Sequence, residues 1–370
     1  MNLLKLLAIL VAIPATLLVL FFWWASAGSY PRDQYSEIVS YPSESAAVSE
    51  LVNPAINSLD NSLDNSPDNF PSTLSGASSD NSGGTFTLIA YNIGYLSGLA
   101  NAAGENRSIM PTPELFARNL KVALSALQAE DPDLIALQEI DLQAKRSYNL
   151  NQVAALAQPL GLPEAAIAIN WDKNYVPFPL WPISEQFGRT VAGQAILSRF
   201  PIQSSERIVL EPVASQPFYY RAFYLDRLAQ VAEIAINGQS LIVINVHLEA
   251  FDEPTRTRQT QVVKDLAERY ATNYPVLLVG DFNSAVTRET EQQPSINLLL
   301  KSKLRSAQLV ELAEPAQFTF PSNAPADALD YVFYTPDQIE PVEARVVTAA
   351  GQASDHLPLL FKFRFRSPSS

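Results

Sequence analysis

Cysteine is absent from this chain of 370 residues, and histidine occurs only twice, at His247 and His356. Without cysteine, the protein cannot build disulfide frameworks, zinc ribbons or thiolate nucleophiles. Two histidines cannot form a three-histidine zinc site. A metal bound by this chain therefore needs mainly oxygen ligands, which favours a hard ion such as Mg²⁺, Mn²⁺ or Ca²⁺.

Basic residues are also scarce. The chain has 25 Lys and Arg residues against 38 Asp and Glu residues, a formal net charge of −13. This excess of acid argues against a non-specific clamp for polyphosphates, because such a clamp needs a basic footprint. It leaves nucleic acid open as a partner, since bound cations can screen an acidic cleft. The length allows one large domain or two ordinary ones.

The N-terminal segment, residues 1–28, is strongly apolar. It carries no charge from Leu6 to Trp24 and ends in consecutive aromatic residues. A run of this length predicts an uncleaved membrane-spanning helix, and Lys5 before it with acids after it places the rest of the chain outside the cytoplasm. The alternative is a signal peptide cleaved near Ala27, followed by secretion.

Residues 29–84 have a different composition, rich in Ser, Asn, Asp and Pro, with a repeated tetrad from Asn57 to Asp68. One arginine stands against eight acids in this segment. Such a sequence buries too little apolar surface to offset the entropy of ordering it. We therefore expect a disordered linker between the N-terminal segment and the rest of the chain.

Residues 85–366 have the pattern of a folded α/β domain. Short β-branched and apolar runs predict strands at 86–90, 134–138, 195–197, 230–236, 241–246, 276–279, 328–334 and 359–365. Helical periodicity predicts helices at 113–130 and 255–270. Asn237-Gly238 between two strands is typical of a type I′ hairpin. A hairpin within this alternating pattern indicates a mixed sheet rather than a purely parallel one.

Polar side chains follow most of these strands, at the ends where sites in α/β folds gather. Asn92, Glu139, His247 and Asp281 with Asn283 follow strands, Asp330 lies within one, and the pair Asp355 and His356 opens the last strand. Any one of them would ordinarily be a turn, cap or solvated residue. Together they occupy six successive elements and include both histidines, which favours a functional site.

In this order the motifs resemble the endonuclease/exonuclease/phosphatase superfamily, which includes deoxyribonuclease I, apurinic endonucleases, inositol-polyphosphate 5-phosphatases and neutral sphingomyelinases. The matching motifs are Asn92, Gln138-Glu139, Asn245-Val246-His247-Leu248, Gly280-Asp281-Phe282-Asn283, Asp330-Tyr331 and Ser354-Asp355-His356. Gly193 to Ile202 and the Arg256-x-x-Gln259 spacing are similar as well. The resemblance implies a four-layer α/β sandwich of two mixed β-sheets flanked by helices, preceded by the N-terminal hydrophobic helix.

The resemblance also implies metal-assisted attack of water on a phosphate ester, the chemistry of phosphodiesterases, nucleases and phosphatases. By resemblance, Asn92, Glu139 and Asp355 hold Mg²⁺ or Mn²⁺, since carboxylate, amide and water oxygens are the ligands of a hard octahedral ion. A non-catalytic scaffold or binding module on the same fold is the alternative. The intact motif set speaks against it, because a scaffold needs neither the histidines nor the carboxylates.

The same resemblance assigns roles to five further residues. Asp281 orients or deprotonates the attacking water, and Asn283 steadies the phosphate or a second ion. His247 donates to a non-bridging oxygen. His356, held by Asp330, places a charged or polarised imidazole beside the phosphorus. Either Asp281 or His356 can act as the base.

Two aromatic stretches lie outside these motifs. Residues 171–183 predict a proline-broken loop that either packs on its own domain or forms a lip for lipid or substrate, and residues 218–224 predict a half-buried strand. Lys173, Arg189 and Arg227 are candidate phosphate or head-group contacts, or surface ion pairs. The expected partners are a phosphate-ester substrate, either a lipid head group or nucleic acid, and the membrane through the N-terminal helix.

Overall fold

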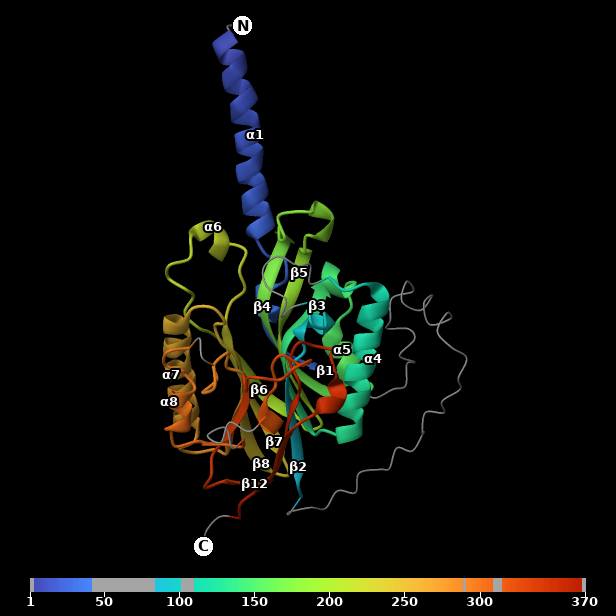
Figure 1. Cartoon of the computed structure of the whole chain (residues 1–370), viewed down its shortest axis with the longest axis vertical. Coiled ribbons are helices and arrows are strands. Elements are labelled where there is room, and N and C mark those ends of the chain that lie inside the picture. Colours follow the sequence, from blue (N-terminus) through green and yellow to red (C-terminus); the bar gives the residue numbers. More distant parts are fainter. Residues whose placement is uncertain (1–2, 42–83, 101–109, 289–290, 309–314, 368–370) are drawn as a thin grey trace, which may run out of the picture.

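The computed structural model describes residues 3–41, 84–100, 110–288, 291–308 and 315–367, with side chains described from residue 10 onward. Two mixed β-sheets lie face to face at its centre, and helices cover their outer faces (Figure 1). The expected four-layer α/β sandwich is therefore confirmed.

One sheet has seven strands and the other has six. The first runs β1 (Ser36–Ser40), β4 (Glu164–Val176), β5 (Gly188–Ser198), β3 (Leu134–Ala144), β2 (Phe86–Asn92), β13 (Leu359–Phe365), β12 (Ile339–Val346). The second runs β10 (Arg305–Ser306), β11 (Asp330–Tyr334), β9 (Val276–Asp281), β8 (Gln239–His247), β7 (Leu228–Ile236), β6 (Ile202–Val209). Among the paired strands described, only β2 with β3 and β8 with β9 are parallel.

Helices lie outside both sheets and at the N-terminus. They are α1 (Leu3–Ser26), α4 (Pro113–Glu130), α5 (Gln152–Ala157), α6 (Phe218–Arg221), α7 (Glu253–Tyr270) and α8 (Asn297–Leu300). Short 3-10 turns are η1 (Arg32–Gln34), η2 (Gly94–Leu96), η4 (Lys145–Ser147), η5 (Ile183–Glu185), η7 (Pro315–Gln317) and η8 (Thr348–Ala350). The expected helix at 113–130 is confirmed, and the helix expected at 255–270 begins two residues earlier.

Local sequence explains where the long helices begin. The hydroxyl of Thr112 accepts a hydrogen bond from the Leu115 amide (3.3 Å), and Pro113 occupies the first turn of α4. At α7, the Asp252 carboxylate accepts from the Thr255 amide in the same way (2.9 Å). Both are standard N-caps, which satisfy amides that have no partner within the helix.

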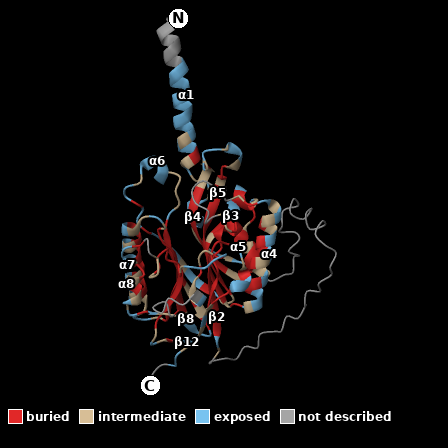
Figure 2. Cartoon of the chain, in the orientation of Figure 1, coloured by how far each residue is buried: buried red, intermediate tan, exposed pale blue. Residues whose placement is uncertain are grey.

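The buried side chains form separate cores between the layers (Figure 2). Leu88 of β2 and Leu277 of β9 belong to the core between the two sheets. Phe116 of α4 packs on the outer face of the seven-stranded sheet, and Val263 of α7 packs on that of the six-stranded sheet. Burial on both faces explains why the central strands read as continuous apolar runs in the sequence.

The predicted hairpin is confirmed, since Asn237 and Gly238 join β7 to β8 with positive φ angles of 51° and 81°. The sequence analysis did not predict β4, β6 or β12. Burial in β6 and β12 is incomplete, with most of their side chains partly or fully exposed. A strand with so few buried positions lacks the apolar run that marked the others.

The linker prediction is wrong at its beginning. Residues 36–40 form β1, which pairs antiparallel with β4 at the edge of the seven-stranded sheet. The carboxylate of Asp172 in β4 fixes the segment before β1, because it accepts hydrogen bonds from the Tyr30 amide (3.0 Å) and the Tyr35 hydroxyl (2.7 Å). An edge strand obtains its stability from such bonds rather than from apolar burial, so composition alone did not reveal it. Residues 42–83 of the expected linker lie outside the described residues.

The expected membrane anchor is also wrong. In the part of the chain that the structure describes, no helix is both long and apolar enough to cross a membrane. The anchored, extracytoplasmic placement of the catalytic domain is therefore withdrawn.

The end of α1 instead contacts the domain. The backbone amide of Asn174 in β4 donates to the carbonyl oxygen of Ala27 (2.8 Å), and its side-chain Nδ2 donates to the carbonyl oxygen of Trp24 (3.0 Å). The ring of Phe22 packs edge-on against those of Phe218 and Phe223, at centroid distances of 6.0 and 5.4 Å. Residues 218–224 are thus not a half-buried strand, as predicted, but the short helix α6 and the turn after it.

Candidate active site

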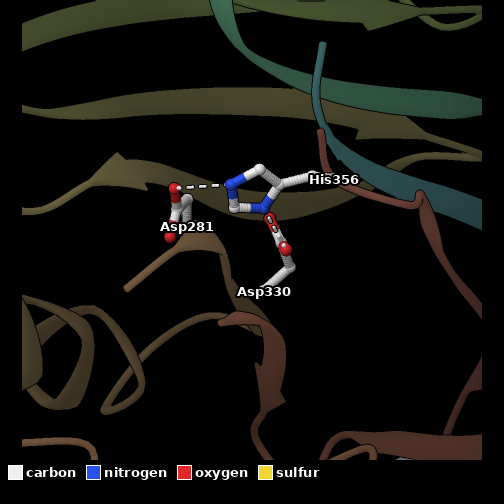
Figure 3. A group of neighbouring side chains, drawn as sticks. All are labelled: Asp281, Asp330 and His356. Atoms are coloured by element: carbon white, nitrogen blue, oxygen red, sulfur yellow. Dashed lines mark hydrogen bonds and ion pairs between the residues drawn. The ribbon is translucent and has the colours of Figure 1, made fainter. Parts of the chain in front are cut away.

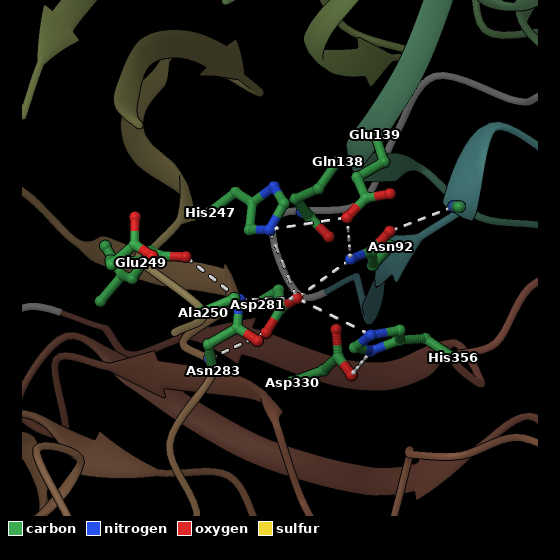
Figure 4. A network of polar contacts seen from close by, with 12 residues as sticks. Asn92, Gln138, Glu139, His247, Glu249, Ala250, Asp281, Asn283, Asp330 and His356 are labelled. Carbon is green, nitrogen blue, oxygen red and sulfur yellow. Dashed lines mark hydrogen bonds and ion pairs between the residues drawn. The ribbon is translucent and has the colours of Figure 1, made fainter. Parts of the chain in front are cut away.

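The predicted site residues meet at one end of the sandwich, where the carboxyl ends of the two parallel strand pairs face each other (Figure 4). Asn92 ends β2 opposite Gln138 of β3, and His247 ends β8 opposite Asp281 of β9. Asp330, the first residue of β11, also pairs with Asp281. The loop before β13 adds Asp355 and His356, both buried. All eight predicted residues therefore lie in or directly beside one network.

Backbone irregularities aim two of these side chains into the site. The register of β3 against β5 shifts between Leu137 and Ile140, and Glu139 within this bulge has a φ of 52°. Asn283, just after β9, also has a φ of 52°. Non-glycine residues rarely adopt this conformation, and where they do, the strain often marks a functional site.

Gly280 allows Asp281 to reach its position. Its φ is 126°, and a Cβ atom there would lie 2.1 Å from the carbonyl oxygen of Val246. Only glycine permits this close approach of β9 to β8. The glycine of the Gly-Asp-Phe-Asn motif is thus explained by backbone packing beneath the site.

Asp281 lies at the centre of the network. Its Oδ2 accepts hydrogen bonds from the side-chain amides of Asn92 (3.0 Å) and Asn283 (3.3 Å), and its Oδ1 accepts from the Asn283 backbone amide (2.9 Å). The Nε2 atoms of His247 and His356 lie 3.7 and 3.8 Å from the same Oδ2. This carboxylate is therefore fixed in orientation and lies between the two imidazoles.

His356 forms a hydrogen-bonded pair with Asp330 (Figure 3), with 2.8 Å between Nδ1 and Oδ2. The Thr319 hydroxyl donates to the same Oδ2 at 2.6 Å. Burial alone would lower the pKa of His356, but the carboxylates of Asp330 and Asp281 hold this pKa well above its usual value. The imidazole is therefore protonated at neutral pH, donates to Asp330 and offers its Nε2 proton to the site.

Asp281, Asp330 and His356 offer ligand atoms within 4.8 Å of one another, a spacing that could hold a metal ion. A metal-bound histidine, however, needs a free lone pair. The protonated His356 has none while it is bonded to Asp330. In the metal-free protein this group is therefore a hydrogen-bonded pair with a proton on Nε2 of His356 that faces Asp281.

The protonation state of His247 is the opposite of that of His356. Its Nε2 lies 2.6 Å from Nη1 of Arg227, and because arginine only donates, this Nε2 must accept. Burial lowers the pKa of His247 well below its usual value, and the positive charges of Arg227 and His356 lower it further. The ring is thus neutral, with its proton on Nδ1. The predicted donation from His247 to a phosphate oxygen therefore requires Arg227 to move away and the ring proton to move from Nδ1 to Nε2.

Arg227 and Glu249 extend the site beyond the predicted set. Arg227 is buried, donates from Nη2 to the Tyr224 hydroxyl (3.0 Å), and has its Nε 3.6 Å from Oε2 of Glu249. Sequence analysis considered Arg227 only as one of several possible phosphate contacts and did not identify Glu249. The available signal was position, because Arg227 directly precedes a strand and Glu249 follows His247 by two residues.

The predicted metal ligands can be tested by their charge and orientation. Burial raises the pKa of Glu139, and it raises the pKa of Asp281 and of Asp355 to about 6 for each. Buried carboxylate oxygens of this kind suit a hard divalent cation. Asn92 fits less directly, since its Nδ2 faces Glu139 (3.3 Å) and its Oδ1 accepts from the Gly94 amide (3.1 Å). It would have to reverse its amide to offer oxygen to a metal.

These pKa shifts predict how the metal-free protein depends on pH. The raised pKa of Asp355 penalises its ionised form in the fold, so this penalty is full above pH 6 and vanishes below the usual pKa of 3.8. We expect Asp355→Asn to stabilise the EDTA-treated protein on the order of 2 kcal/mol at pH 7.5, which raises Tm by about 5 °C. The gain should shrink toward zero near pH 4, as followed by thermal melts.

The matched control is Glu340→Gln, a change at an exposed carboxylate of β12. It should leave Tm within about 1 °C of wild type at both pH values, as surface substitutions usually do. An Asp355→Asn gain of equal size at pH 4 and pH 7.5 would contradict the electrostatic explanation, because packing differences do not titrate.

Comparisons with known proteins agree with this geometry. The sequence profile of the Endonuclease/Exonuclease/phosphatase family matches residues 89–356. A UPF0294 protein of Vibrio cholerae serotype O1 is 35% identical over 184 residues, 49% of this chain and 57% of that relative. A UPF0294 protein of Vibrio vulnificus is 32% identical over 129 residues, 34% of this chain and 40% of that relative. The chain thus spans little more than half the length of the first relative.

Solved structures share the fold at low sequence identity. The endonuclease/exonuclease/phosphatase of Beutenbergia cavernae is similar with a TM-score of 0.54 and 19% identity, covering 76% of this chain and 72% of that one. The human nocturnin catalytic domain, solved with a bound sulfate anion, gives a TM-score of 0.51 and 20% identity over 76% of this chain and 94% of its own. With its profile match across both sheets and the whole site, this chain belongs to the endonuclease/exonuclease/phosphatase family.

Proposed function

We propose that this protein is a divalent-metal-dependent phosphoesterase in which water attacks phosphorus. Membership of the family supports hydrolysis of phosphate esters in general. The observation that carries the finer proposal is that Asn92 joins Glu139 (3.3 Å) to Asp281 (3.0 Å), and that Oδ2 of Asp281 lies 3.8 Å from Nε2 of His356. Buried acids beside a buried cationic donor can bind a metal and a phosphate next to each other.

Glu139 and Asp355 would hold the metal, with Asn92 as a third ligand after its amide reverses. Both carboxylates carry raised pKa values that a bound cation would lower, so their buried charge is stabilised only when the cation is present. Mg²⁺ or Mn²⁺ bound there would neutralise charge on the phosphate oxygens and polarise the ester.

The remaining groups act directly on water and phosphate. Asp281, fixed by Asn92 and Asn283, is oriented to accept a proton from the attacking water. His356 donates from Nε2 to a phosphate oxygen, and Asp330 keeps it protonated. Preorganised donors of this kind stabilise the charge that spreads over the equatorial oxygens in the transition state.

Arg227 supplies a second cationic donor from the opposite side of the site. It is ionised and buried, and its Nε has no hydrogen-bond partner among the described residues. If Arg227 turns toward a substrate phosphate, it also frees Nε2 of His247, which can donate to a phosphate oxygen once the ring proton moves there from Nδ1. We place Arg227 with His247 as the groups that bind the non-bridging oxygens, while nucleic acid and lipid head groups both fit this chemistry as substrates.

Metal removal tests the proposal. We expect the full-length protein to hydrolyse bis(p-nitrophenyl) phosphate with Mg²⁺ or Mn²⁺, and to lose this activity in excess EDTA until the metal is restored. Glu139→Gln should raise the metal concentration needed for half activity at least about tenfold, since it removes a charged ligand. Glu340→Gln serves as the control. Hydrolysis that persists at full rate in EDTA would sink the metal-dependent mechanism.

A further inference from the structure

Exposed apolar side chains surround the end of the sandwich at which the site lies. They are Phe178, Leu180, Trp181 and Ile183 between β4 and β5, Phe218, Tyr219 and Tyr220 of α6, and Phe251 before α7, and we call this set the apolar rim. Leu180 and Trp181 are each 78% exposed and Phe251 is 79% exposed. Scattered apolar residues on a surface need no explanation, but a group of this size marks an interaction site.

The rim is attached to catalytic side chains at two points. After α6 the chain leads to Tyr224, whose hydroxyl accepts from Arg227, and Arg227 contacts His247. On the other side, the Phe251 amide donates to the Glu249 carboxylate at 3.0 Å. A molecule that covers the rim therefore lies next to the residues proposed to bind the phosphate.

Hydrogen bonds and ring contacts hold the rim in its outward arrangement. The Phe187 amide donates to the Phe178 carbonyl (2.9 Å), and Nζ of Lys145 donates to the Ser184 carbonyl (2.7 Å). The indole of Trp171 donates to the Phe223 carbonyl (2.8 Å) beside α6. Leu180 and Trp181 thus lie on the loop between β4 and β5, which these hydrogen bonds fix in place. This loop is at the same end of the molecule as α6 (Figures 1 and 2).

The composition of the rim favours lipid over nucleic acid. Aromatic side chains can stack on bases, but the aliphatic side chains of Leu180 and Ile183 gain little from stacking. Both gain free energy in hydrocarbon, and tryptophan and tyrosine suit the boundary between lipid and water. A mixture of aliphatic residues with tryptophan and tyrosine is typical of proteins that lie on a lipid surface.

Charge around the rim points the same way. In the segments 173–189 and 217–227, Arg189 pairs with Asp172, and the buried Arg227 lies 3.6 Å from Glu249. Lys173 and Arg221 remain, of which Arg221 lies on α6 within the rim and is exposed. Basic residues beside exposed apolar groups complement the anionic phosphates of a phospholipid surface.

We propose that the apolar rim docks on a phospholipid surface and so presents lipid phosphate esters to the site. The proposal rests on the proposed phosphoesterase function for its catalytic part, whereas docking itself does not depend on catalysis. The contact is peripheral, with side chains entering the head-group region, and needs no helix that crosses the bilayer.

Vesicle binding by the full-length protein tests the proposal. The variant Leu180→Asp with Trp181→Asp is compared with wild type and with Val342→Asp, which changes an exposed valine of β12 away from the rim. We expect the rim variant to partition at least tenfold less onto vesicles of phosphatidylglycerol and phosphatidylcholine, and Val342→Asp to partition as wild type does. Because α1 is unchanged in all three proteins, the difference reports the rim alone.

Two activity measurements distinguish failure of this inference from failure of the proposed function. The rim variant should hydrolyse soluble bis(p-nitrophenyl) phosphate at the wild-type rate, while its release of water-soluble phosphate from the vesicles falls with binding. Equal vesicle binding by wild type and the rim variant would overturn the proposal. Loss of binding to a labelled single-stranded oligonucleotide, with vesicle binding retained, would overturn it in favour of nucleic acid. Rim-dependent vesicle binding without hydrolysis of any ester supports docking and rejects the proposed function.

Discussion

Asp281→Asn is expected to lower kcat for phosphate-ester hydrolysis by about 10³-fold or more without unfolding the protein. Asparagine has the shape of aspartate and keeps an acceptor for the Asn283 amide, which now bonds Oδ1 at 2.9 Å. What it loses is the negative charge that accepts a proton from water, together with the Oδ2 acceptor of the Asn92 and Asn283 side-chain amides. General-base contributions of this kind are typically about 10²–10⁴-fold, and loss of the charge also weakens the field around the phosphate.

The pH dependence of the wild-type protein gives a second readout. Burial raises the pKa of Asp281 to about 6, so its ionised fraction falls as the pH drops through 6. We expect the activity to fall on the acid side at or below that pH, because a bound cation lowers the pKa, and we expect Asp281→Asn to lack this limb. Steady-state rates between pH 4.5 and 8 measure both effects.

The control is Asp265→Asn, which removes a carboxylate from the exposed face of α7. It should leave kcat and its pH profile unchanged. Asp281→Asn should also melt at or above the wild-type temperature without metal, since it removes a buried charge whose ionised form the fold penalises. Wild-type activity in a folded Asp281→Asn protein would show that another group serves as the base.

The residues at the centre of the site could be predicted from the sequence, because the strand topology brings the ends of their strands together. Asn92, Glu139, His247 and Asp281 follow apolar runs, and the carboxyl ends of parallel neighbours meet at one edge of a sheet. Asp330 begins its strand rather than ending it, and the family resemblance gave its role as the partner of His356. These residues could be placed in order along the chain without any knowledge of distances.

Other features depend on contacts that no local pattern encodes. The acceptor state of His247 follows from Arg227, which lies 20 positions earlier in the chain and meets it across β7 and β8. Likewise β1 is identified only by its pairing with β4, because none of its own side chains is fully buried. The sequence therefore predicts the apolar core and the order of the motifs. The protonation state of His247 and the pairing of β1 with β4 depend on the tertiary structure.

His356→Ala is expected to lower kcat by about 10³-fold, and Asp330→Asn by about 10²-fold, in the range typical of acid–base groups. His356 donates Nδ1–H to Asp330 at 2.8 Å, and this carboxylate helps to hold the pKa of His356 well above its usual value. If the pair acts as one unit, the double variant should lose no more than His356→Ala alone, because the carboxylate acts only through the imidazole.

The sign of the pH shift distinguishes this coupling from a structural effect. Activity that needs protonated His356 falls as the pH rises through the pKa of that residue. Asp330→Asn removes a carboxylate that raises this pKa, so the alkaline limb should move to lower pH, the direction expected for a lost charge partner. Asp337→Asn, at an exposed turn before β12, should leave the limb in place. Additive losses with an unmoved limb would mean that Asp330 supports the fold rather than the charge of His356.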